Sequence, residues 1–187
     1  MLNIRVCLLS ILLLLPISSQ AVEIEGVSLP DSINLENKTL LLNGAGIRSK
    51  FFFDIYVAGL YLEAKSSSAD EIISNNTVKR ISMDFLYDEV TKEKLTDGWN
   101  TGFSKNQSKP QMQALQERLD QFNSYFSSAH KGDRIIFDFL GNGATQVTIN
   151  DKLAGTVEGA DFQQALVAVW LGNKPADKDL KASLLGR

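Results

Sequence analysis

The sequence predicts an α+β protein in which a largely antiparallel sheet is covered by a layer of helices. Three observations predict this fold. Strand-like apolar runs dominate the chain from residue 22 onward, two helical stripes follow, and hairpin signals then lead to two more helices. This order is typical of an α+β fold rather than of alternating βαβ units. Because no linker, repeat or composition break interrupts residues 22–187, we expect one domain there.

The first 21 residues differ from the rest of the chain. Arg5 supplies a positive charge, residues 8–16 are almost wholly apolar, and Ser19 and Ala21 are small residues at the positions that signal peptidase reads. Because the apolar run is short for a membrane span, we predict a signal peptide over residues 1–21, with an uncleaved N-terminal anchor as the alternative. We therefore expect a periplasmic or secreted protein with no stable membrane span after cleavage.

Strand signals fill the first half of the predicted domain. Apolar runs at residues 22–27 and 39–42 predict two short strands, with polar turn residues at 34–38 between them. Residues 50–63 are the longest candidate, and the nearly unbroken apolar run predicts a central strand covered on both faces. Gly59 in its middle indicates a bulge or a close backbone approach. Residues 80–87 alternate apolar and polar side chains, which predicts a half-buried strand.

Helical periodicity begins at Thr91. Leu95, Trp99 and Phe103 recur at every fourth position and predict one helix. A second helix is predicted from Pro110, because a proline fits the first turn of a helix. Its apolar stripe consists of Met112, Leu115, Leu119, Phe122 and Phe126.

The last third of the chain predicts a β-meander and two helices. Strands at residues 135–139 and 145–150 are joined by a glycine-rich turn at 141–143, and a turn at 150–152 leads into residues 153–157. We expect Asp161 to cap the next helix and Gly172 to close it. Pro175 is expected to open the final helix.

Composition and charge exclude several functional classes. Removing residues 1–21 takes away one basic residue and no acidic one, so the formal net charge changes from −3 to −4. Such a domain lacks the basic surplus that binds nucleic acid. The one cysteine, Cys7, lies in the predicted signal peptide, so disulfides and thiolate metal sites are not expected. Because His130 is the only histidine, we do not expect a metal site built on imidazoles. No Walker motif is present, and we expect no cofactor.

Two features near residue 48 are candidates for chemistry. The segment Gly44-Ala45-Gly46 resembles a dinucleotide-binding loop, but Ser49 stands where the third glycine belongs and a strand follows instead of a helix. Arg48 lies beside a strand rich in aromatic residues, where its guanidinium needs an anionic partner. That partner is either a ligand or a structural carboxylate such as Asp54. Tyr56 is likewise either a core residue or part of a pocket wall.

Two segments resemble a known family. Residues 42–51 (LNGAGIRSKF) and 55–63 (IYVAGLYLE) are similar to the Gly-x-Gly-x-Arg segment and following strand of the chalcone isomerase superfamily. Residues 159–166 (GADFQQAL), 170–175 (WLGNKP) and 180–181 resemble its paired C-terminal helices. The resemblance is strongest to the exported bacterial chalcone-isomerase-like branch. It implies an open-faced β-sandwich, in which an antiparallel sheet packs against helices with a ligand cleft between them.

The resemblance also implies a site. The arginine that Arg48 matches faces the substrate in plant chalcone isomerases, and it holds a carboxylate in the fatty-acid-binding members. Tyr56 stands where the enzymes have a threonine, and residues 91–100 lack their tyrosine. Lys94 and Asn100 are comparable only loosely with the lysine and asparagine of the enzymes.

The resemblance therefore implies a non-catalytic protein that binds a fatty or aromatic acid through Arg48, Tyr56 and Asn100. No catalytic residue is predicted. The alternatives are an intramolecular lyase or isomerase of unknown substrate, and a structural or partner-binding periplasmic protein. A lyase or isomerase would bring Arg48, Tyr56 and Asn100 together. A structural or partner-binding protein would pair Arg48 with an internal carboxylate. The sequence does not indicate an oligomeric state.

Overall fold

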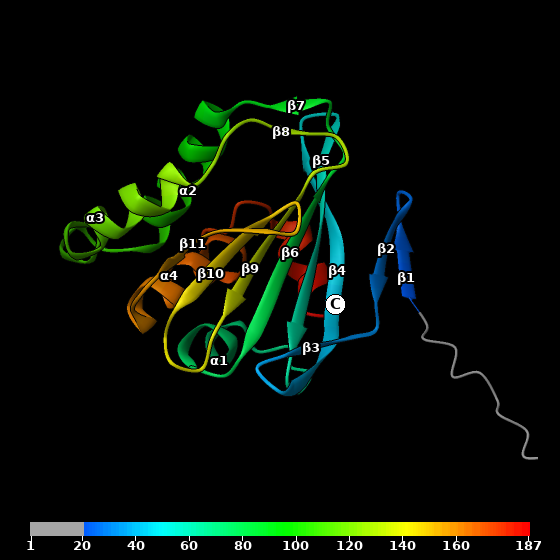
Figure 1. Cartoon of the computed structure of the whole chain (residues 1–187), viewed down its shortest axis with the longest axis horizontal. Helices are drawn as coiled ribbons and strands as arrows, with labels where there is room; N and C mark the ends of the chain where they lie inside the picture. The colour runs from blue at the N-terminus through cyan, green and yellow to red at the C-terminus, as the bar shows by residue number, and fades with distance from the viewer. Residues whose placement is uncertain (1–20) are drawn as a thin grey trace, which may run out of the picture.

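The computed structural model describes residues 21–187 and shows an antiparallel sheet with helices on one face (Figure 1). The predicted signal peptide lies outside the described residues, apart from Ala21. Seven strands form the sheet in the order β11-β10-β9-β6-β5-β4-β3, and every neighbouring pair is antiparallel. The fold class predicted from the sequence is confirmed. The sheet strands are β3 (Ser32–Leu35), β4 (Lys38–Lys50), β5 (Phe53–Leu62), β6 (Lys79–Phe85), β9 (Arg134–Phe139), β10 (Thr145–Ile149) and β11 (Lys152–Val157).

Five helices and two small hairpins complete the described chain. The two hairpins lie apart from the main sheet. Among residues 21–187, no helix is long and apolar enough to cross a membrane. The hairpins pair β1 (Ala21–Ile24) with β2 (Val27–Pro30), and β7 (Glu89–Val90) with β8 (Ala129–His130). The helices are α1 (Ala69–Ser74), α2 (Lys92–Asn106), α3 (Lys109–Ser124), α4 (Ala160–Leu171) and α5 (Lys178–Leu184).

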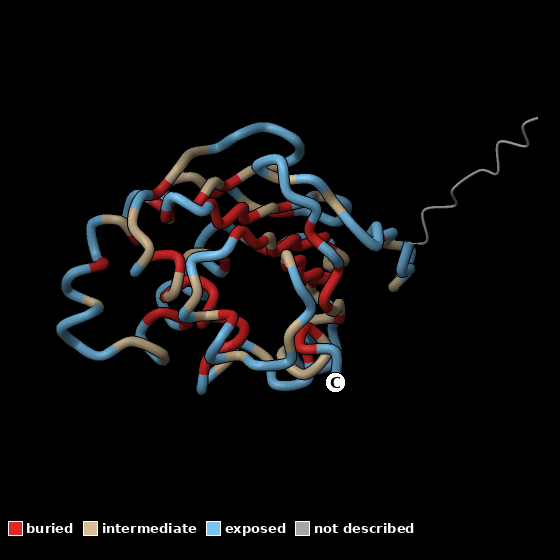
Figure 2. Tube along the Cα trace, turned by 90° about the horizontal axis from the view of Figure 1, so that it is seen from below, coloured by how far each residue is buried: buried red, intermediate tan, exposed pale blue. Residues whose placement is uncertain are grey.

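The sheet buries side chains on both faces. The larger core lies between the sheet and the helices, and aromatic rings fill its centre, with Trp99 and Phe137 5.6 Å apart between ring centroids. A smaller cluster lies on the opposite face, where Leu29 of β2 covers Val57 and Tyr61 of β5. Buried segments accordingly run through the interior, and exposed segments surround them (Figure 2). Residues 56–62 of β5 are all buried, which confirms the predicted central strand over that part.

The largest error in the predicted strands concerns residues 50–53. We expected them inside a covered strand, but β4 runs on to Lys50 and the chain turns at Phe51 and Phe52 before β5 begins. The apolar run continues through this turn without a glycine, proline or asparagine, so the usual turn signals are absent. The predicted first strand is also wrong in extent, because Glu25 and Gly26 turn the chain between β1 and β2 with φ of 49° and 76°.

Two predicted helix starts are also wrong. Asp161 lies in the first turn of α4 and bonds Arg118, whereas Gly159 is the N-cap. The last helix begins after Asp177, whose carboxylate accepts hydrogen bonds from the backbone of residues 179 and 180, and Pro175 precedes it in the loop. The helices predicted at Thr91 and Pro110 are confirmed, with Thr91 as the N-cap of α2 and Pro110 in the first turn of α3.

Candidate functional site

A small cavity lies where α2 approaches the helix-covered face of the sheet. Its volume is about 40 Å³. It brings Arg48 of β4 and Tyr56 of β5 together, as the sequence predicts, and their backbones are direct partners in the β4–β5 ladder. The remaining lining residues are mainly apolar: Ile55, Met83, Phe85, Val90, Lys94, Leu95, Gly98, Trp99, Val169 and Ala176.

The two glycines before Arg48 explain its position. Gly44, Gly46 and Arg48 lie opposite Leu60, Ala58 and Tyr56, so all three face the helices. A Cβ on Gly44 would lie 2.1 Å from the backbone oxygen of Ser183, and one on Gly46 would lie 2.6 Å from the Cβ of Ser183. The glycines therefore let α5 pack directly on the strand. They do not form a phosphate-binding loop.

Arg48 lacks the internal partner that a structural role would need. Its Nε is buried and has no hydrogen-bond partner among the described residues, and none of their ion pairs includes its side chain. Asp54, the candidate structural partner, instead accepts a hydrogen bond from the Ser49 hydroxyl at 2.7 Å. The guanidinium carbon lies 5.6 Å from the centroid of the Tyr56 ring, a cation–π distance. Arg48 thus takes part in no ion pair of the described residues, although the Asp177 charge acts on the neighbouring Tyr56 hydroxyl.

Tyr56 is a protonated phenol at neutral pH. Its side chain is 3% exposed, and burial raises the pKa of the Tyr56 hydroxyl although the nearby Arg48 charge opposes that rise. The hydroxyl oxygen accepts a hydrogen bond from Trp170 Nε1 at 3.1 Å. Because that bond occupies an oxygen lone pair, the phenol proton remains available for donation to a second group.

A third donor belongs to the same cavity. Trp99 lines it, and its indole Nε1 is buried without a partner. Arg48, Tyr56 and Trp99 are thus three lining residues with donor groups, and two of these donors are buried without a partner. An unpaired buried donor costs about 1–3 kcal/mol, so an anionic oxygen that satisfied Arg48 and Trp99 would be strongly favoured.

The cavity offers few groups for acid–base chemistry, since Tyr56 and Lys94 are the lining residues that could transfer a proton. The cavity contains no histidine or carboxylate, and Lys94 is its only other charged residue. Lys94 extends the positive character toward the exposed surface of α2. Trp99 and Lys94 were not predicted as site residues. The apolar stripe of α2 predicts Trp99 as a core residue. Lys94 is comparable only loosely with the lysine of the chalcone isomerases.

Asn100 does not join Arg48 and Tyr56. It is exposed on α2, where its Oδ1 accepts a hydrogen bond from Asn123 Nδ2 at 2.8 Å, and it lines neither this cavity nor the larger one described below. The convergence of three residues that an intramolecular lyase would need is therefore not present.

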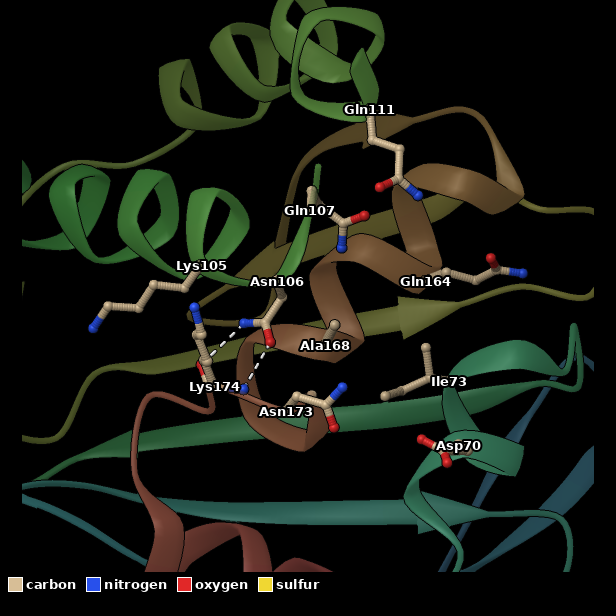
Figure 3. Close-up of a pocket in the computed structure, with 11 residues that line it drawn as sticks. Asp70, Ile73, Lys105, Asn106, Gln107, Gln111, Gln164, Ala168, Asn173 and Lys174 are labelled. Atoms are coloured by element: carbon tan, nitrogen blue, oxygen red, sulfur yellow. Dashed lines mark hydrogen bonds between the residues drawn. The ribbon is translucent and has the colours of Figure 1, made fainter. Parts of the chain in front are cut away.

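A larger hollow, of about 420 Å³, lies between α1, the α2–α3 connection and α4 (Figure 3). Amide and lysine side chains surround it, and Asn106 ties the α2 end to the loop after α4. The Asn106 amide donates to the Lys174 carbonyl and accepts from the Lys174 N–H, both at 3.0 Å. Arg48 and Tyr56 are absent from this hollow. It lacks the apolar wall and the unpaired buried donors of the smaller cavity.

Comparisons with known proteins agree with the fold. The chain matches the protein family described as chalcone isomerase-like over residues 21–186. Among solved structures, it is similar to a fatty-acid binding protein of Arabidopsis thaliana, with 18% sequence identity and a TM-score of 0.69. That match covers 89% of this chain and 96% of the plant chain. The chain matches no curated protein sequence.

Proposed function

The chain belongs to the chalcone isomerase-like family, and from that premise we propose that it binds an apolar carboxylic acid without catalysing a reaction on it. The observation that carries the proposal is the buried, unpartnered Nε of Arg48 beside an apolar cavity. A ligand carboxylate would neutralise the guanidinium and accept hydrogen bonds from the donors of Arg48, Tyr56 and Trp99.

Three further observations support this proposal. No carboxylate among the described residues pairs with Arg48, which disfavours a purely structural arginine. The cavity is lined by no histidine or carboxylate, so an enzyme would have to rely on Tyr56 and Lys94 for proton transfer. The similar plant structure is that of a fatty-acid binding protein, so this fold is compatible with an acyl ligand.

Ligand binding requires α2 to move. The cavity has room for about 40 Å³, whereas pockets for organic ligands commonly enclose about 300 Å³ or more. Leu95 and Trp99 of α2 form one wall, and Gly98 lies between them on the same helix. A carboxylate that binds Arg48 would direct its chain toward these side chains. We infer that α2 shifts outward to admit the apolar chain of the ligand and that the ligand-free protein closes around the empty site.

We also propose an extracytoplasmic location for this binding function, on the basis of the signal peptide predicted over residues 1–21. We propose that the mature protein acts in the periplasm or is secreted. Fractionation of cells that make the full chain, with mass measurement of the N-terminus, tests this point. Recovery of the uncleaved chain in the cytoplasm would refute export while leaving the ligand-binding proposal intact.

The binding proposal is tested by mass spectrometry of small molecules that co-purify with residues 22–187. We expect a fatty or aromatic acid with the unmodified protein and its loss from the Arg48→Met variant. Asn100→Ala is the matched control, because Asn100 lies on the same helix as Trp99 but outside the cavity. Equal ligand content in the protein and in Arg48→Met would refute Arg48 as the anchor. An empty protein from several expression hosts would favour a partner-binding role.

A further inference from the structure

Three consecutive phenylalanines form the tip of the β4–β5 hairpin. The side chains of Phe51, Phe52 and Phe53 are 85%, 99% and 54% exposed. Phe53 rests against Tyr87, with 5.4 Å between ring centroids, while Phe51 and Phe52 make no aromatic contact with the described residues. They belong to neither hydrophobic core. The apolar character of this tip therefore contributes nothing to the packed interior.

Turn formation does not require these residues either. Phe51 has a φ of +59°, a conformation that glycine and asparagine adopt readily and that an aromatic residue adopts at a cost of about 1–3 kcal/mol. Phe52 follows it in the two-residue turn between Lys50 and Phe53, which pair in the ladder. Local rules broken without a gain in packing are typical of functional positions.

We propose that this tip inserts into the surface of a lipid bilayer. The three rings together expose an area of roughly 500 Å², since one buried aromatic side chain covers about 150–250 Å². A stable protein interface buries about 800 Å² on each partner. The tip is thus small for a protein–protein interface, whereas a bilayer needs only a few projecting apolar side chains to hold a protein at its surface.

Insertion would bring the Arg48 site to the level of the lipid headgroups. Phe51 is three positions after Arg48, a length of about 10 Å along an extended strand. Interfacial elements bury their apolar side chains about 5–10 Å deep at the boundary between headgroups and acyl chains. If Arg48 anchors an acyl carboxylate, as the proposed function holds, the inserted tip places the site against the phase from which that acid is taken or to which it is delivered.

The charge of the domain indicates which interaction drives binding. The predicted mature chain has a net charge of −4, so anionic lipids do not attract it as a whole, although Lys50 lies directly beside the tip. We therefore expect binding to neutral phosphatidylcholine vesicles, with little gain from added phosphatidylglycerol or from low salt.

The test is co-sedimentation of residues 22–187 with phosphatidylcholine vesicles. The double substitution Phe51→Ser, Phe52→Ser is expected to lower the partition coefficient at least about a hundredfold, because burying each phenylalanine is worth about tenfold or more. Leu41→Ser is the matched control, since Leu41 is 39% exposed and pairs with Leu62 at the opposite end of β4 from the tip, so its loss should leave partitioning unchanged.

Other outcomes overturn the proposal. Equal sedimentation of the protein and the double variant refutes insertion of the tip. A dimer that the double substitution dissociates assigns the tip to a second copy of the chain instead. Quenching of a Phe52→Trp variant by lipids brominated on the acyl chain checks that the tip itself enters the bilayer, and no quenching overturns the proposal. Fatty-acid binding measured without vesicles separates the two proposals: if it survives while insertion fails, only the membrane proposal falls.

Discussion

Alanine at Gly46 tests whether α5 packs on β4 as the structure shows. Glycine within a strand ordinarily costs about 0.5–1 kcal/mol relative to alanine, so Gly46→Ala should stabilise the protein if nothing opposes the new methyl group. The added Cβ would instead lie 2.6 Å from Ser183 Cβ and 2.9 Å from Ser183 Oγ. Carbon atoms pack at about 3.5–4.0 Å, so α5 has to shift by roughly 1 Å.

The sign of the stability change therefore decides the question. Overpacking of this kind costs about 1–3 kcal/mol, which outweighs the gain in strand propensity and leaves a net loss of about 1–2 kcal/mol. For a domain of this size, that loss lowers Tm by about 2–8 °C. The assay is denaturant unfolding of residues 22–187, followed by far-UV circular dichroism. Gly98→Ala is the control, because its Cβ would meet nothing within 4 Å and should raise stability by about 0.5–1 kcal/mol.

Removal of the opposing side chain should rescue the variant. Ser183→Gly deletes the Cβ and Oγ that the new methyl group contacts, so the double variant should be more stable than the sum of the two single effects predicts. A stabilised Gly46→Ala protein, or a double variant without positive coupling, would show that α5 does not pack on β4 in this way. The explanation of the Gly-x-Gly-x-Arg segment would then be wrong.

Two further predictions concern buried charge. Burial lowers the pKa of the Lys79 ammonium from 10.5 to about 8, so the unfolded chain holds the proton more tightly than the native protein. Stability should therefore rise with pH from about 8 toward 10.5, by up to about 3 kcal/mol, and Lys79→Met should remove this rise in denaturant titrations at pH 7.5 to 9.5. Unchanged pH dependence in that variant would refute the assignment. Arg48→Met should leave the Tm of the ligand-free protein unchanged or higher. The substitution removes an unpaired buried donor that destabilises the protein by about 1–3 kcal/mol, and this gain offsets loss of the stabilising Tyr56 contact, worth about 0.5–1 kcal/mol. A fall of more than about 4 °C would show that Arg48 has a structural partner.

The periodic parts of the fold were predictable from the sequence. The fourfold spacing of Leu95, Trp99 and Phe103 predicts α2, and all three side chains are buried. The turn at Asn150 and Asp151 predicts the β10–β11 hairpin, and both residues adopt positive φ there. These signals succeed because they depend on local geometry: a helical repeat, or a backbone conformation that few residues tolerate.

The missed features depend on long-range contacts or on absent signals. Phe51 and Phe52 form a turn without any turn residue, so the apolar run predicts covered structure where the chain reverses. The reason for Gly44 and Gly46 is the approach of α5 from the far end of the chain, which strand patterning does not encode.

The candidate site was predictable in part. Arg48 and Tyr56 are candidates both from their place in the sequence and from the family resemblance, and the structure brings them together. Asn100 faces away because one helical position separates it from Trp99, and a step of one residue turns a helix by about 100°. The missing partner of Arg48 was not predictable, since it depends on every neighbour that β4, β5 and α5 assemble.

The central claim is that Arg48 recognises a ligand carboxylate, and a thermodynamic cycle tests it most directly. The four dissociation constants are those of a fatty acid and its methyl ester, each bound to the unmodified protein and to Arg48→Met. A hydrogen bond to a charged group is worth about 1.5–3 kcal/mol, so the unmodified protein should prefer the acid by about 10-fold to 100-fold. That preference should vanish in Arg48→Met. An equal preference in both proteins, or none in either, would contradict the account.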